Sequence, residues 1–214
     1  MKKPFSPEKK ASVQEHILSC ARDLFLSQGI AAVKMTDIAE ASHLGVATLY
    51  RYFKVKKAIV IAVAISLWNE KRGEFAKISE QNEEQNLSGI ESLKSLFDHF
   101  VSLFNDQKPF VLFVRDFDSF CLNERIKPEE LRDYDAVFAQ IESLFIACGE
   151  KGVKDHSIRA DRDIPLIYSA YSRALMGLGE KLVGTGAIVP SDEKEDPRKM
   201  IEALVDVLIA YFAQ

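Results

Sequence analysis

A run of polar, aromatic and cationic side chains between residues 46 and 57 has the composition of a surface that binds an anionic polymer. Hydroxyl groups and cations bind phosphate oxygens, and short side chains on a slender helix reach base edges in the major groove. The members of the run that carry these groups are Thr48, Tyr50, Arg51, Tyr52, Lys54, Lys56 and Lys57. Their close spacing favours contact with duplex DNA, where phosphates and base edges lie near one another.

Two short helices with a tight break between them are expected to present this run. Thr36 is predicted to cap the first helix, because its hydroxyl can accept an unpaired backbone N–H. Residues 42–45, Ser-His-Leu-Gly, supply the break, and the second helix is expected over residues 46–53. Val46 and Ala47 make the beginning of that helix apolar, so any base contact by them would favour the methyl group of thymine.

Charge is distributed unevenly along the chain, whose 214 residues have a formal net charge of −4 at pH 7. Residues 1–57 hold ten Lys and Arg against five Asp and Glu, a balance of +5, so the remainder carries −9. This asymmetry directs an anionic partner to the N-terminal part. Two interpretations stay open for Lys54, Lys57 and the lysines of the first ten residues: contact with DNA, or a solvated surface.

Apolar residues recur at helical spacing along the whole chain, and no strand-like alternation persists. Helices are expected at residues 8–28, at the pair within 36–53, and at 55–78, 90–105, 109–122, 128–148, 165–183 and 197–212. The sequence therefore predicts an all-α protein of about nine helices. Because the helix at 55–78 is apolar at first and charged later, it is expected to connect a small N-terminal domain to a larger one.

Three motifs follow one another in the N-terminal part. They are Phe25-Leu26-Ser27-Gln28-Gly29, Thr36-x-Ile38-Ala39 and Thr48-Leu49-Tyr50-x-Tyr52-Phe53-x-x-Lys56. Their order and spacing resemble the TetR family of transcriptional regulators over residues 10–60. The resemblance implies a three-helix helix-turn-helix domain at residues 1–57 and a larger helical domain at 58–214. It also implies that the second domain binds an effector and pairs two subunits, and that the protein is not an enzyme.

The resemblance carries roles over to individual residues. Thr36, Tyr50 and Lys56 become phosphate contacts, and Thr48, Arg51 and Tyr52 face the groove. The full set of predicted DNA-binding residues is Thr36, Val46, Ala47, Thr48, Tyr50, Arg51, Tyr52, Lys56 and Lys57. Tyr50 and Tyr52 are open to assignment to the core, but a buried tyrosine needs a partner for its hydroxyl, which favours exposure.

Two residues depart from the family pattern at the break. His43 stands where the family usually has Gly, and Gly45 stands where it usually has a Ser cap. Histidine tolerates a left-handed backbone better than most residues. Glycine caps a helix less well by only about a few tenths of a kcal/mol. Neither departure removes the motif.

Nine of the fourteen phenylalanines lie between residues 97 and 145. They either fill a packed core or line an apolar cavity for a hydrophobic or aromatic effector, and the sequence leaves both open. The residues assigned to such an effector site are Phe97, Phe100, Phe104, Phe113, Phe117, Phe120, Phe138, Tyr168, Tyr171 and Arg173.

Other kinds of chemistry are not favoured, and no cofactor or metal site is expected. The three cysteines, at 20, 121 and 148, are far apart in apolar surroundings, which is typical of free thiols in a reducing cytoplasm. Neither His99 nor His156 has a Cys or carboxylate at metal-ligand spacing. The apolar run at 58–68 is shorter than the roughly 20 residues of a membrane span, and the N-terminus lacks a signal peptide. We therefore expect a cytoplasmic protein that does not enter the membrane.

The sequence as a whole predicts a repressor that leaves its operator when a small apolar effector binds. The helices at 165–183 and 197–212 are expected to form a homodimer. The effector would move the connector helix, so that the two reading heads no longer fit major grooves about 34–36 Å apart. Two alternatives from other classes are a small helical enzyme acting on an apolar substrate in the Phe-rich region, and a helix-turn-helix turned protein-interaction module. The enzyme lacks a recognisable nucleophile, and the charge of residues 1–57 disfavours the module.

Overall fold

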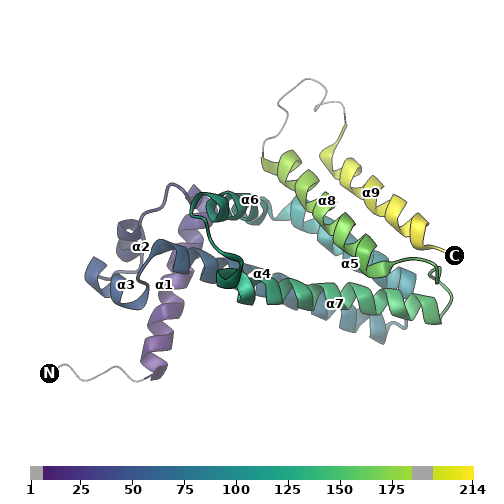
Figure 1. Cartoon of the computed structure of the whole chain (residues 1–214), viewed down its shortest axis with the longest axis horizontal. Helices are drawn as coiled ribbons and strands as arrows, with labels where there is room; N and C mark the ends of the chain where they lie inside the picture. The colour runs from purple at the N-terminus through teal and green to yellow at the C-terminus, as the bar shows by residue number, and fades with distance from the viewer. Residues whose placement is uncertain (1–6, 185–194) are drawn as a thin grey trace. The chain divides into compact units, whose positions relative to one another are not determined.

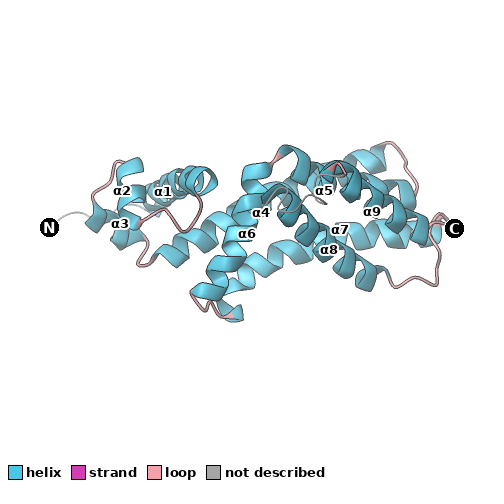
Figure 2. Cartoon of the chain, turned by 90° about the horizontal axis from the view of Figure 1, so that it is seen from above, coloured by secondary structure: helices cyan, strands magenta, loops and turns pink. Residues whose placement is uncertain are grey.

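The computed structural model describes residues 7–184 and 195–214, in which α-helices account for nearly all regular structure (Figures 1 and 2). The helices are α1 (Pro7–Gln28), α2 (Met35–Ala41), α3 (Val46–Tyr52), α4 (Lys56–Glu84), α5 (Gly89–Asp106), α6 (Lys108–Asn123), the 3-10 helix η1 (Pro128–Leu131), α7 (Arg132–Lys154), α8 (Ile164–Gly184) and α9 (Pro197–Phe212). Between the described residues the only β-pairing is an isolated bridge from Ile158 to Ala213. The all-α prediction, with nine α-helices in these ranges, is confirmed.

The N-cap that the sequence predicted at Thr36 was wrong. Helix α2 begins at Met35 with Lys34 at the N-cap, and Thr36 lies inside the first turn. The carboxylate of Asp37 accepts the backbone N–H of Lys34 at 2.7 Å, so an acid satisfies this end of the helix. The helix can therefore start before the threonine.

Two helices are longer than the sequence predicted. Helix α4 continues past residue 78 to Glu84, because the Glu and Gln residues there are good helix formers despite their polarity. Within this extension the side chain of the buried Asn82 donates to the carbonyl of Ser92 at 3.4 Å. Helix α7 continues past residue 148 to Lys154, and a side chain at Gly89 would collide with the backbone of Gly152. Gly152 therefore does not end α7, and the absence of a side chain at Gly89 allows the two chain segments to approach closely.

The chain divides into two compact units. The first combines the described residues up to Leu67 with Leu112–Tyr134, and the second combines Trp68–Val111 with Asp135–Gln214. The chain passes from one unit to the other at three points, and each point falls inside a helix. These helices are α4, α6 and α7. The predicted boundary at residue 57 stays a prediction.

The core of the first unit joins the helix-turn-helix region to α6. Ile17, Phe25 and Leu49 are fully buried. The ring of Phe25 on α1 lies 6.4 Å from that of Phe113 on α6, which in turn stacks at 6.2 Å on Phe117. Each ring of this size contributes about 1.5–3 kcal/mol when it is fully buried. The part of α6 from Leu112 onward is therefore integral to this unit.

Aromatic rings also form the core of the second unit. Phe145 on α7 is the centre, with ring centroids of Phe97, Tyr168 and Phe75 at 4.8, 4.8 and 5.6 Å. Helix α5 is fixed at its start by Ser88, whose backbone N–H donates to the carboxylate of Glu91 at 2.8 Å. The three distances between ring centroids around Phe145 are those of packed aromatic pairs.

Candidate functional site

The break between α2 and α3 is a tight, hydrogen-bonded turn. His43 has φ = 53°, in the left-handed region, which explains why the family pattern favours glycine at this position. The N–H of Leu44 donates to the carbonyl of Ala39 at 2.9 Å. The hydroxyl of the buried Ser42 donates to the carbonyl of Ile38 at 2.7 Å. This turn fixes α3 as the second helix of a helix-turn-helix (Figure 1).

Helix α3 has one buried side and one side that faces solvent. Leu49 packs in the core with no exposed area, whereas Val46 and Tyr50 are 41% and 46% exposed. Ala47 and Arg51 are exposed as well. Because residues four apart share a helix face, these four side chains form one stripe. Thr48 and Tyr52, which were also predicted to face the groove, are half-buried at its edges.

Two of the predicted phosphate-binding groups, Lys56 and Thr36, have internal partners. The ammonium of Lys56 donates to the carbonyl of Ile30 at 2.5 Å and lies 5.9 Å from the ring centroid of Phe120. Burial lowers the pKa of Lys56, against the attraction of Glu124 and Asp37. An ammonium has three donors, so this bond leaves it able to bind a phosphate. Thr36 is exposed and donates to the carboxylate of Asp37 at 3.2 Å.

Lys57 forms an ion pair within the first unit. Its ammonium lies 2.5 Å from the Oε2 atom of Glu130 on η1, and the two side chains are 36% and 35% exposed. The residues are far apart in sequence, so their spacing gave no signal of this contact.

The residues predicted to bind an effector lie in both compact units. Phe113, Phe117 and Phe120 on α6 belong to the first unit. The others, which belong to the second, are Phe97, Phe100, Phe104, Phe138, Tyr168, Tyr171 and Arg173. Many of the rings contact one another: Phe100 and Phe104 lie 5.5 Å apart, and Trp68 and Phe138 lie 4.5 Å apart. The rings therefore pack in the core, and their role in effector binding stays a prediction.

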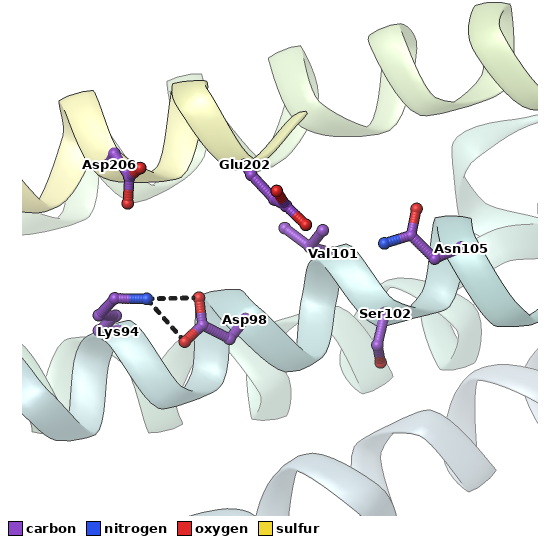
Figure 3. A pocket seen from close by; sticks show the side chains of 7 residues that line it. All are labelled: Lys94, Asp98, Val101, Ser102, Asn105, Glu202 and Asp206. Carbon is purple, nitrogen blue, oxygen red and sulfur yellow. Dashed lines mark hydrogen bonds and ion pairs between the residues drawn. The ribbon is translucent and has the colours of Figure 1, made fainter. Parts of the chain in front are cut away.

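Two hollows of the second unit are lined mainly by charged and polar residues. One of about 370 Å³ lies between α5 and α9, where Lys94 bonds both carboxylate oxygens of Asp98 at 2.8 Å (Figure 3). The other has about 540 Å³ and includes Glu83, Lys151 and Lys154. Neither of them contains a residue of the predicted effector set.

The sequence did not predict a polar cluster beside the aromatic core, in which Lys71 is buried and Glu74 and His99 are half-buried. Lys71 on α4 is only 5% exposed, and its ammonium lies 2.6 Å from the Oε1 atom of Glu74. The other carboxylate oxygen of Glu74 lies 3.2 Å from Nε2 of His99. The ammonium is also 5.6 Å from the ring centroid of Phe110. The i, i+3 spacing of a Lys and a Glu on a largely apolar helix was the signal for this pair.

Helices α8 and α9 carry apolar residues on the side that does not face their own core. Ile201, Val205, Leu208 and Phe212 of α9 are buried in the subunit. The exposed apolar members of the two helices are Leu166, Ala170, Ala174, Gly177, Met200, Ala203, Val207, Ala210 and Tyr211. We call these nine residues the α8–α9 face. On α9 the exposed Met200 and Val207 each precede a buried residue, Ile201 and Leu208.

Comparison with known proteins identifies the family. Residues 17–63, which span most of α1 and all of α2 and α3, match the family model of the bacterial regulatory proteins of the tetR family. The chain belongs to the TetR family. It is 24% identical over 168 residues to the HTH-type transcriptional repressor KstR2 of Mycolicibacterium smegmatis, and the match covers 77% of each protein.

Solved structures share the fold across the whole chain of this TetR-family protein. A structure from Mesorhizobium loti, described as a TetR-family transcriptional regulator, has a TM-score of 0.72 at 17% identity and covers 96% of this chain and 98% of its own. Thermus thermophilus FadR, a TetR-family repressor solved with lauroyl-CoA, has a TM-score of 0.59 at 17% identity and covers 92% and 94%. The match includes the helical C-terminal part as well as the helix-turn-helix.

Membership of the TetR family settles the broad class of the protein. TetR-family members are DNA-binding transcriptional regulators and not enzymes, so the enzyme alternative is dropped. Over the described ranges, none of the helices has both the length and the apolar character needed to cross a bilayer. In the same ranges His, Cys, Asp and Glu form no cluster of three or more suited to a metal ion.

Proposed function

We propose that this TetR-family protein is a ligand-responsive repressor, which binds its operator as a homodimer and releases it when a small apolar effector binds. It would act on chromosomal DNA in the cytoplasm. The observation that carries most weight is the stripe of Val46, Ala47, Tyr50 and Arg51 on α3, held out by the turn at His43. A stripe of this kind fits a recognition helix in the major groove.

The two ends of the stripe are proposed to contact different bases. Arg51 carries the bidentate donor that suits guanine, and Val46 and Ala47 offer methyl groups to thymine. Tyr50, Thr36 and Lys56 are the proposed phosphate contacts, which set position and affinity rather than sequence.

The test of DNA recognition is selection from random duplexes with the full chain, followed by titration of the selected duplex. Arg51→Ala should relax the sequence preference, and Tyr50→Phe should weaken all duplexes alike. Lys77→Ala is the matched control, because Lys77 is exposed on α4 in the second unit. If Arg51→Ala selects the same sequences as the wild type, the reading role of α3 is refuted.

The α8–α9 face supports the homodimer. An exposed surface with Leu166, Met200 and Val207 at its larger positions and Ala or Gly at its smaller ones allows close helix packing. Two helices from each subunit, related by a twofold axis, would form a four-helix interface.

The effector is proposed to be largely apolar and to bind among the helices of the second unit. Two observations support this: the aromatic composition of α5, α7 and α8, and the shared fold with FadR, which was solved with lauroyl-CoA. The Lys71–Glu74–His99 cluster, in which Lys71 is buried, offers a polar anchor for one end of such a molecule.

The effector hypothesis is tested by linkage. Mass spectrometry of the purified protein identifies retained small molecules, and lauroyl-CoA serves as a second probe. If an effector releases DNA, operator duplex must weaken effector binding by the same factor by which the effector weakens DNA binding. Titration curves that coincide with and without duplex, for every compound that binds, would show that the second unit is not a switch.

A further inference from the structure

Lys57, one of the cations close to the recognition helix in sequence, forms an ion pair with Glu130. Lys57 is the second residue of α4, five residues after α3 ends, and Glu130 lies on η1 between α6 and α7. All of these residues belong to the same compact unit. The Nζ–Oε2 distance of 2.5 Å is that of a direct, charge-assisted hydrogen bond.

Glu130 is held in position by its own local structure. Its second carboxylate oxygen, Oε1, accepts the backbone N–H of Lys127 at 3.1 Å, and Pro128 fixes the start of η1. The hydrogen bond from Lys57 and that from Lys127 lower the pKa of Glu130, so the carboxylate is charged at neutral pH. The pair is therefore present under the conditions in which DNA is bound, and its acid does not depend on DNA for its orientation.

We propose that Glu130 is an intramolecular competitor of the DNA backbone, which holds Lys57 and thereby lowers the affinity for every duplex. This inference rests on the proposed function, because it requires that Lys57 reach a phosphate. The lysine ammonium is a compact point charge. Carboxylate and phosphate oxygens demand the same donor, so phosphate binding must break or weaken the contact with Glu130.

The size of the effect follows from the exposure of the pair. An ion pair that is about one-third exposed contributes little in water, and breaking it weakens binding by up to about fivefold for each copy of α4 on DNA. Two copies in a dimer would give up to about 25-fold. Releasing Lys57 to a phosphate should also steepen the dependence of log K on log salt concentration by up to about 0.9 per copy.

The experiment compares Glu130→Gln with Glu129→Gln in the full chain. The amide oxygen of Gln can still accept the N–H of Lys127, so the change removes the charge and keeps η1. Glu129 is an exposed neighbour with the same charge, so its substitution controls for the change in net charge. The probe is a mixed-sequence duplex titrated at several salt concentrations, because the effect does not depend on the operator. Thermal unfolding confirms that each variant is folded.

We expect Glu130→Gln to bind duplex about two- to fivefold more tightly per copy than Glu129→Gln, with a steeper salt dependence. Lys57→Ala should abolish this gain in the double variant. Equal affinities of the two Gln variants, or weaker binding by Glu130→Gln, would overturn the proposal. So would a gain that persists without Lys57. If the proposal fails while Arg51→Ala still changes sequence preference, the proposed function stands and only the role of Glu130 falls.

Discussion

In the proposed homodimer, replacing Val207 by Glu should separate the subunits without unfolding them. Val207 is 58% exposed on α9, whereas the next residue, Leu208, has no exposed area and packs in the subunit's own core. The two positions are adjacent in sequence but differ in what they contact. A charge at position 207 therefore tests the α8–α9 face, and replacing the side chain of Leu208 by that of Ala tests the stability of the fold.

The expected weakening follows from the exposed area of Val207. Full burial of an aliphatic side chain contributes about 1.5–3 kcal/mol, so burying the exposed part of Val207 in an interface would contribute about 1–2 kcal/mol. A twofold axis repeats the contact, which gives about 2–4 kcal/mol, or about 30- to 1,000-fold in the dissociation constant. Burying the carboxylate of Glu adds a further cost.

The assay is sedimentation velocity at micromolar concentration, with helix content measured by circular dichroism on the same samples. Val207→Glu should sediment as a helical monomer and lose operator binding. Leu208→Ala should stay dimeric but be less stable by about 2–5 kcal/mol. A Val207→Glu protein that stays dimeric would refute the assignment of this face, and one that loses its helix content would place Val207 in the fold.

Four further predictions concern the reading head, the packing at two glycines and the pH dependence. Replacing single thymines of a selected operator by deoxyuridine removes only a methyl group, and it should weaken the wild type but not Val46→Ser at the thymine that Val46 contacts. Gly179→Ala should destabilise the fold by about 1–3 kcal/mol, because the added methyl meets the ring of Phe104. Gly73→Ala, with open space around it, should stabilise α4 by about 1 kcal/mol. Burial lowers the pKa of His99, so the unfolded chain takes up the proton first and stability should fall as the pH drops below about 6.5. His99→Gln should reduce that fall in thermal unfolding between about pH 7 and pH 5.5, and an unchanged profile would contradict the assignment.

Local spacing was enough to predict the elements that carry DNA recognition. The helix predicted over residues 46–53 is present as α3, with Leu49 buried beside exposed groups, because helix faces follow directly from sequence position. The cap at Thr36 was wrong because helical periodicity does not fix helix ends, and Asp37 supplied the competing acceptor.

Contacts between distant segments could not be predicted in this way. Helix α9 is apolar on more than one side, and only packing decides that Leu208 faces the subunit core while Val207 faces outward. The partnership of Lys57 with Glu130 depends on how α6 and η1 fold back on the first unit. The assignment of phenylalanines to one effector region met the same limit, since Phe113 and Phe117 pack with α1 and Tyr134.

The three crossings between the compact units, in α4, α6 and α7, bear on how this protein can be cut or recombined. Proteases and tolerated insertions favour exposed, extended segments, whereas each crossing here runs through continuous helix. A fragment that ends at residue 57 or 67 would also lack α6, and with it the ring of Phe113 that lies against Phe25 and the ring of Phe117 that stacks on Phe113. The reading head should therefore be exchanged between relatives by replacing surface residues of α3, and not by joining gene segments at a linker.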